Sequence, residues 1–260
     1  LDCTTARGNA MTQRFEGLYC AAVTPMHKDE VNTDLLTLHL TSLASDGCDG
    51  VLLMGTTGEG PSLSLAERES ILSAAVSANS GLKLLAGTGT PSLPETIQAT
   101  RRAFDLGAAA VVVVPPFFFR NAPVEGLRAF YGAVIEKSVP SDGAIIIYHI
   151  PPVSGVPIPK ALLAGLVDDY GDRVAGVKDS GGDLNYSRDL IADLPSLEVF
   201  VGSERLLLEG LKAGAAGCIT AGANVLAPLC AAVYRAWRTG QPAESLQERL
   251  SAMRVLIEAV

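Results

Sequence analysis

The sequence is of the α/β class and predicts a (β/α)8 TIM barrel with an extra C-terminal helix, on three observations. Short apolar runs alternate with helical patterns eight times along the 260 residues. The repeat from one run to the next averages about thirty residues, the size of a strand and helix unit. No linker rich in Pro, Gly or Ser interrupts the series. Eight such units in one continuous chain are typical of a closed barrel of parallel strands.

The expected strands are continuous runs of Val, Ile, Leu and Ala, as in parallel strands that are covered on both faces. They are residues 18–23, 50–54, 82–87, 110–114, 144–148, 174–178, 198–201 and 217–219. Helices are expected over residues 33–45, 64–79, 94–106, 124–138, 158–169, 184–194, 203–213 and 225–239. Gly47, Gly107 and Gly214 each stand between a helix and a strand, where a left-handed residue ends the helix.

A doubly wound open sheet is the alternative arrangement of such units. It would carry a glycine-rich phosphate-binding turn after the first strand, and Thr24-Pro25-Met26-His27 is not one. We therefore expect the barrel to span residues 15–240. A flexible polar tail is expected at 1–14 and a C-terminal helical extension at 241–260, which packs outside the barrel or against a partner chain.

Composition excludes several classes of protein. The net charge is −8 and no basic block is present, so nucleic acid is not expected as a partner. The longest apolar runs fall far short of the ~20 residues that cross a bilayer. The five cysteines are widely spaced without a C-x-x-C motif, which indicates a reducing compartment and a cytoplasmic location. The three histidines are scattered, so no metal site is expected.

Lys178 ends the sixth expected strand, and a glycine-rich segment follows at once. Burial disfavours the charged form of an amine, and the neutral form is a nucleophile toward ketones. The alternative is that Lys178 leaves the strand into solvent or pairs with Asp179. The fifth strand ends at Tyr148, and neighbouring strands lie about 4.8 Å apart. A phenol and an amine on these two strand ends would share one small substrate, with the phenol as a proton shuttle; alternatively, Tyr148 is an ordinary core tyrosine.

The turn Gly55-Thr56-Thr57-Gly58-Glu59-Gly60 follows the second strand. It offers two hydroxyls and free backbone N–H groups, which suit a carboxylate or another small anion. It is not a P-loop, because no Gly-Lys-Ser/Thr follows. The next helix begins with a capping box formed by Ser64 and Glu67. The alternative is a turn that merely connects strand and helix.

The motifs GTTGEG (55–60), YHIP (148–151) and GVKDSGGD (176–183) occur in an order and spacing that resemble the family grouping dihydrodipicolinate synthase with N-acetylneuraminate lyase. The resemblance extends from about residue 15 to residue 237. It implies a class I, Schiff-base, pyruvate-handling aldolase that assembles as a tetramer of two dimers and needs no metal or organic cofactor. The family usually has more C-terminal helix, so this member is either compact or cut short.

Carried over to this chain, the resemblance implies that Lys178 forms an imine with pyruvate or another 2-oxo acid. Tyr148 would shuttle protons and stabilise the carbinolamine. Thr56 and Thr57 would hold the carboxylate, with Thr57 also linked to Tyr148. Backbone atoms of two further strand ends would border the pocket, those of Gly202 and Ile219.

Two departures bear on the substrate. Lysine-pathway synthases carry an arginine for the aldehyde's carboxylate where this chain has Val153, and a neighbouring subunit's tyrosine where it has Phe118. Loss of a guanidinium–carboxylate pair typically costs a few kcal/mol. We therefore expect a lyase or aldolase for a 2-oxo-3-deoxy or 4-hydroxy-2-oxo acid, with pyruvate and an aldehyde as the small-molecule partners. The apolar residues 117–119 and Val153 would also tolerate a less polar aldehyde half.

Three alternatives remain open. The first is dihydrodipicolinate synthase, which condenses pyruvate with aspartate semialdehyde. The second, of another class, is a non-catalytic regulatory barrel that binds a 2-oxo acid. The third is a metal-dependent aldolase, which the scattered histidines disfavour.

Overall fold

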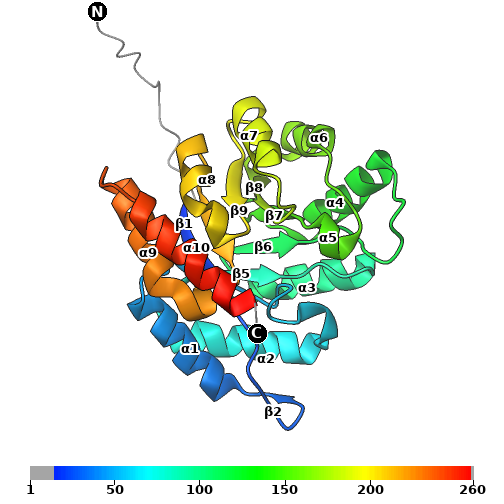
Figure 1. Cartoon of the computed structure of the whole chain (residues 1–260). Coiled ribbons are helices and arrows are strands. Elements are labelled where there is room, and N and C mark those ends of the chain that lie inside the picture. The colour runs from blue at the N-terminus through cyan, green and yellow to red at the C-terminus, as the bar shows by residue number, and fades with distance from the viewer. Residues whose placement is uncertain (1–14, 259–260) are drawn as a thin grey trace, which may run out of the picture.

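Eight parallel strands close into a barrel in the order β1-β10-β9-β8-β7-β6-β5-β4, and helices surround it (Figure 1). The computed structural model describes residues 15–258. The barrel strands are β1 Gly17–Ala21, β4 Gly50–Leu53, β5 Lys83–Gly87, β6 Ala110–Val113, β7 Ile145–His149, β8 Val174–Asp179, β9 Glu198–Val201 and β10 Gly217–Thr220. Because β1 pairs with both β4 and β10, the predicted (β/α)8 barrel is confirmed and the open sheet is wrong.

The helices follow the strands as predicted. They are α1 Thr33–Ser45, α2 Leu65–Ala78, α3 Leu93–Asp105, α4 Val124–Ser138, α6 Lys160–Tyr170, α7 Leu184–Asp193, α8 Leu207–Ala213 and α9 Ala223–Arg238. Single turns of 3-10 helix lie at η1 Gly60–Ser62, η2 Gly171–Arg173 and η3 Glu204–Leu206. The capping box of Ser64 and Glu67 is present at the start of α2. Gly47, Gly107 and Gly214 have φ values of 94°, 103° and 105°, as expected of left-handed residues after helices.

Two small elements were not predicted. Strands β2 Met26–His27 and β3 Glu30–Val31 form a hairpin between β1 and α1. Helix α5, Pro151–Ser154, begins directly after β7. Proline is suited to the first turn of a helix, where its missing N–H would have no intrahelical acceptor. The Pro151-Pro152 pair therefore starts a short helix between the expected strand at 144–148 and the expected helix at 158–169.

The core has two layers. Alternate strand residues point into the barrel, where Tyr19, Leu52, Ile146 and Phe200 pack together. The residues between them face outward, as Ile145 does, and pack against the helices. This alternation follows from the period of two along a strand. It determines which strand-end side chains reach the interior.

Helix α10, Glu244–Glu258, packs against α9, α8 and η3 on the outside of the barrel. Its Arg254 forms an ion pair with Glu204, with 3.1 Å between Nη1 and Oε1. Glu204 is fully buried and also accepts a hydrogen bond from the hydroxyl of Thr220. Gln247 donates to the backbone carbonyl of Glu204 at 2.9 Å. These bonds fix α10 to the segments that follow β9 and to the end of β10.

The expected tail at residues 1–14 and the last two residues of the predicted extension lie outside the described residues. Within residues 15–258, none of the helices combines the length and the apolar character that a membrane span requires.

Replacing Arg254 tests the contribution of this ion pair. Arg254→Met leaves the buried carboxylate of Glu204 without its cation, which we expect to lower the free energy of unfolding by about 3 kcal/mol. Urea unfolding measures the change. Arg128→Met is the control: Arg128 pairs with Asp169 and both side chains are more than a third exposed, so the loss should stay below about 1 kcal/mol. Equal losses in the two variants would contradict the expectation.

Candidate active site

Lys178 and Tyr148 lie side by side at the ends of β8 and β7, where their Cα atoms are register partners. Both side chains are buried, with exposed fractions of 3% and 5%. The Nζ atom of Lys178 lies 4.2 Å from the centroid of the Tyr148 ring. A cation so close to an aromatic face is attracted by its quadrupole. The alternative in which Lys178 leaves the strand into solvent is therefore wrong.

A β-bulge directs Lys178 into the barrel. Ile145 pairs with Val174 but Ile146 pairs with Gly176, so Ala175 is an extra residue on β8. The extra residue shifts the alternation by one position. Val177 consequently packs in the outer layer, and Lys178 points inward.

Gly176 makes the bulge possible. A Cβ atom at this position would lie 2.4 Å from the backbone oxygen of Glu198 on β9. Real Cβ atoms do not approach an oxygen so closely, so a side chain here would push the two strands apart. A glycine is therefore required where β8 passes β9.

The turn at residues 55–60 brings a hydroxyl to the phenol. Thr56 donates a hydrogen bond to the hydroxyl of Tyr148 at 3.4 Å. The turn is closed by two backbone bonds, from Glu59 to Thr56 at 3.1 Å and from Gly60 to Gly55 at 3.0 Å. The predicted link from Thr57 to Tyr148 is not among the hydrogen bonds of the described residues. The binding role of Thr57 stays a prediction.

Ser180 is a site residue that sequence reasoning missed. Its hydroxyl forms a hydrogen bond with Tyr148, and it lies so close to Gly202 that a Cβ on the glycine would be 2.1 Å from Oγ. The backbone continues the pairing of the strands here, since the Gly202 N–H donates to the carbonyl of Asp179 at 2.7 Å. The sequence position of Ser180 could have indicated this role, because Ser180 stands two residues after Lys178 and so lies on the same side of an extended chain.

The surroundings of Tyr148 lower the pKa of its phenol. Burial raises the pKa, but the positive charge of Lys178 and hydrogen bonds from Thr56, Ser180 and Lys178 lower it by more in total. All other tyrosines have raised pKa values: Tyr19, Tyr131, Tyr186 and Tyr234 mainly through burial, and Tyr170 mainly through its hydrogen bond to Glu136. Tyr148 is therefore the tyrosine best suited to give up and regain a proton.

Asp179 is held on the outer side of the barrel and not by Lys178. Its carboxylate accepts hydrogen bonds from the Gly181 N–H at 2.9 Å and from the Ser187 hydroxyl at 2.6 Å. Its register partner His149 accepts from the N–H of Ile158 at 3.1 Å. Burial lowers the pKa of His149, and Asp179 opposes this by raising it. The carboxylate of Asp179 thus stabilises the connection between β8 and α7. The amine of Lys178 faces the ring of Tyr148 instead.

A small pocket of about 30 Å³ lies beside the phenol. It is lined by Leu52, Met54, Gly55, Thr56, Pro61, Gly87, Gly89, Val112, Val114 and Tyr148. The side chain of Ile219 is buried in the barrel interior, and Gly202 lies against Ser180. Val153 and Phe118 are 62% and 78% exposed and do not line this pocket. No cluster of His, Cys, Asp and Glu in the described part of the chain has the form of a metal site.

The lowered pKa of Tyr148 predicts an early step in a titration of the tyrosines. A phenol with a lowered pKa ionises first as the pH rises, so one tyrosine should form phenolate at a lower pH than the others. Tyr148→Phe should remove this step. Lys178→Met should move it to higher pH, because burial then acts without the opposing positive charge. Ultraviolet difference absorbance follows the ionisation.

The control variant is Tyr170→Phe. Tyr170 donates to Glu136 at 2.7 Å near the surface, and its raised pKa places it among the later tyrosines. The early step should persist unchanged in this variant. An early step that survives Tyr148→Phe would refute the assignment.

Comparison with known proteins agrees with this geometry. The model of the "Dihydrodipicolinate synthetase family" matches residues 14–259. A protein of Chloroflexus aurantiacus described as an uncharacterized DapA-like lyase is 40% identical, over 94% of this chain and 82% of that protein. The 4-hydroxy-tetrahydrodipicolinate synthase of Methanopyrus kandleri is 31% identical, over 87% of this chain and 75% of that protein.

Solved structures give the same result. Dihydrodipicolinate synthase from Aquifex aeolicus is 29% identical with a TM-score of 0.86, over 92% of this chain and 81% of that chain. The Escherichia coli prophage protein YagE, solved in complex with pyruvate, has a TM-score of 0.88 over 94% of this chain and 83% of that chain; at 23% identity it shows the fold alone. The chain belongs to the dihydrodipicolinate synthetase family and is a class I pyruvate-dependent lyase.

Proposed function

We propose that the enzyme makes or cleaves a carbon–carbon bond of a 2-oxo acid through an imine between Lys178 and the keto carbon of pyruvate. The observation that carries the proposal is the burial of the Lys178 amine against the Tyr148 ring, at 4.2 Å from Nζ to the centroid. Lys178 is the one buried lysine of the six in the chain, and all six are described. An amine in this environment has both the position and the neighbours that imine chemistry requires.

In the proposed mechanism, the Lys178 amine attacks the keto carbon and gives a carbinolamine. Tyr148 gives a proton to the departing hydroxyl, water leaves, and the imine forms. Cleavage of the bond between C3 and C4 then sends its electron pair toward the imine nitrogen and leaves an enamine. The proton of the C4 hydroxyl passes to the Tyr148 phenolate as the aldehyde departs. The lowered pKa of Tyr148 supports this exchange, because a phenolate must form and be reprotonated in each cycle.

The turn at residues 55–60 is the proposed carboxylate site. The carboxylate of a 2-oxo acid is bonded directly to its keto carbon, so it must bind within a few ångströms of the amine and the phenol. Thr56 lies in this turn and contacts the Tyr148 hydroxyl. Thr57 and the backbone N–H groups of the turn would supply the remaining hydrogen bonds.

The pocket walls support a substrate without a second carboxylate. Beyond Tyr148 the pocket is lined by Gly87, Gly89, Val112 and Val114, and none of its lining residues is charged. Val153, where lysine-pathway synthases carry an arginine, is apolar and exposed. We therefore favour a 2-oxo-3-deoxy or 4-hydroxy-2-oxo acid, with pyruvate as one product of cleavage and an aldehyde as the other.

Reduction with borohydride in the presence of pyruvate tests the imine. We expect one covalent adduct, located on Lys178 by peptide mass spectrometry, and none in Lys178→Ala. The control is Lys137→Ala, which removes an exposed lysine of α4 and should leave the adduct in place. An adduct of full yield in Lys178→Ala would contradict the mechanism.

Turnover distinguishes the remaining functions. A panel of sugar acids and 4-hydroxy-2-oxo acids, assayed by release of pyruvate, should contain the substrate. Condensation of pyruvate with aspartate semialdehyde would instead identify a dihydrodipicolinate synthase. An imine without turnover in either assay would favour a regulatory barrel that binds a 2-oxo acid.

Replacing Tyr148 tests the proton transfer. Tyr148→Phe keeps the ring beside Lys178 but removes the hydroxyl, and we expect the turnover rate to fall by ~10²–10⁴-fold. Steady-state kinetics on the substrate found in the panel measures the loss. Tyr170→Phe, with its hydroxyl remote from the pocket, should keep the original rate. A rate unchanged in Tyr148→Phe would exclude Tyr148 from the mechanism.

A further inference from the structure

Arg68 is a buried arginine that the proposed mechanism does not use. It lies in the first turn of α2, behind the turn at residues 55–60, and only 7% of it is exposed. No other arginine of residues 15–258 is buried. Burying a guanidinium is costly unless its donors are satisfied. The partners that satisfy the Arg68 guanidinium therefore indicate what this residue does.

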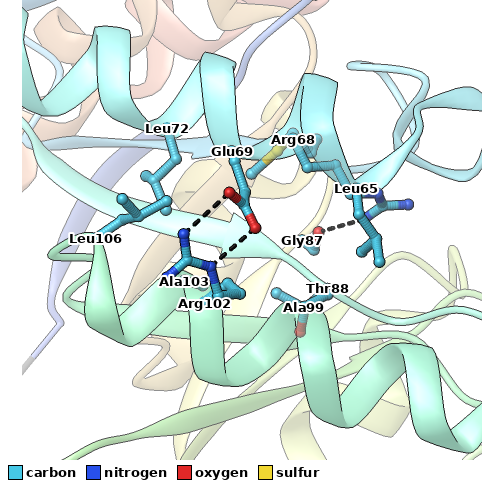
Figure 2. Close-up of a pocket in the computed structure, with 11 residues that line it drawn as sticks. Leu65, Arg68, Glu69, Leu72, Gly87, Thr88, Ala99, Arg102, Ala103 and Leu106 are labelled. Carbon is cyan, nitrogen blue, oxygen red and sulfur yellow. Dashed lines mark hydrogen bonds and ion pairs between the residues drawn. The ribbon is translucent and has the colours of Figure 1, made fainter.

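The guanidinium is satisfied by backbone carbonyls. Nη1 donates to Gly87 at the end of β5 at 3.0 Å, Nε donates to Leu63 at 3.3 Å, and Nη2 donates to Gly60. No carboxylate of the described residues forms an ion pair with it. Figure 2 shows the side chain reaching the carbonyl of Gly87. Three carbonyls from two segments, the turn before α2 and the end of β5, thus converge on one planar group.

Two of these carbonyls belong to a tightly packed contact. A Cβ at Gly60 would lie 1.9 Å from the Met54 carbonyl oxygen, and a Cβ at Gly87 would lie 2.4 Å from the same atom. Met54 itself has a φ of 56°, which is strained for a residue with a side chain. The end of the turn and the end of β5 therefore close around the Met54 carbonyl. Arg68 bonds both sides of this contact.

The same turn carries the groups of the proposed carboxylate site. Gly60 is bonded to Gly55 across the turn, and Thr56 reaches Tyr148. On the opposite side, the Thr24 hydroxyl donates to the Gly58 carbonyl at 2.6 Å. The backbone of the turn is thus held by a hydroxyl from the segment that follows β1 and by a guanidinium from α2. A change in the latter contact would move the N–H groups that face the ligand.

We propose that Arg68 is a positioning residue that holds the turn at residues 55–60 in the shape that binds a 2-oxo acid carboxylate, and so sets the affinity for that acid. The inference rests on the proposed function of the turn. A planar fork of five donors matches several carbonyls at fixed angles, whereas the ammonium of a lysine is a single point charge. Without the fork, buried carbonyls of Gly60 and Gly87 lose a partner, and the turn relaxes toward other hydrogen bonds.

The test compares ligands with and without a carboxylate. Arg68→Met and Arg68→Lys are titrated with pyruvate and with acetone, and the half-saturating concentration for borohydride-trapped adduct on Lys178 is measured. For pyruvate it should rise about 10- to 100-fold in Arg68→Met and less in Arg68→Lys. For acetone, which has the ketone but no carboxylate, it should stay within about twofold of the original enzyme. An equal rise for both ketones, or no rise for pyruvate, would overturn the proposal.

Arg102→Met is the matched control. Arg102 reaches the same region from α3 and pairs with Glu69 at 2.8 Å (Figure 2). Its ion pairs are with Glu69 and Asp105, and not with residues of the turn. Its half-saturating pyruvate concentration should be unchanged. A rise equal to that of Arg68→Met would assign the effect to general packing and overturn the proposal.

Folding and the proposed function are checked separately. Thermal unfolding shows whether each variant is folded. If Arg68→Met is unfolded, the pyruvate and acetone titrations of Arg68→Lys test the proposal. Unfolding of both variants would assign Arg68 to fold stability and overturn the proposal. Failure of the original enzyme to form any adduct with pyruvate would refute the proposed function itself, an outcome distinct from an adduct that is insensitive to Arg68.

Discussion

The pairing of β7 with β8 brings the amine and the phenol together, and a β-bulge at Ala175 turns Lys178 to the same side as Tyr148. If residues 174–178 alternated regularly from the outward-facing Val174, Val177 would lie inside the barrel and Lys178 in the outer layer, where an ammonium would meet apolar helix faces. The bulge reverses this arrangement, and Gly176 allows the backbone to pass the Glu198 carbonyl. An irregularity of the backbone, and not of the side-chain pattern, therefore creates the site.

The neighbours of Lys178 are consistent with the nucleophilic attack proposed for its amine. A carboxylate in contact with a lysine stabilises the ammonium and so withholds the nucleophilic form. The one carboxylate adjacent in sequence, that of Asp179, is bound by Gly181 and Ser187 on the other side of the strand. The amine faces the Tyr148 ring instead. The positive charge of Lys178 in turn lowers the pKa of Tyr148, against the effect of burial.

Much of this could be predicted because it depends on local pattern. Buried parallel strands are continuous apolar runs, so their order and their ends could be predicted from the sequence. Because Tyr148 and Lys178 end two neighbouring strands, they could be predicted to lie side by side. Ser180 was missed because its position depends on the close approach of Gly202 from the next strand, a contact between residues distant in sequence. Likewise, which of two adjacent threonines faces the phenol depends on the conformation of the turn, which composition does not encode.

The proposed catalytic groups lie on rigid elements, whereas the residues at the positions expected to contact the aldehyde lie on exposed connections. The amine and the phenol are on barrel strands, and the turn at residues 55–60 packs against β5 so closely that a Cβ at Gly60 or Gly87 would have no room. By contrast, Phe118 lies in the β6–α4 connection with a φ of 82° and most of its side chain exposed, and Val153 lies in the exposed turn of α5. Residues at such positions can change without disturbing the strands beneath them. In the proposed mechanism, the half of the substrate common to all 2-oxo acids would therefore meet the rigid part of the site, and discrimination between aldehydes would fall to the connections around it.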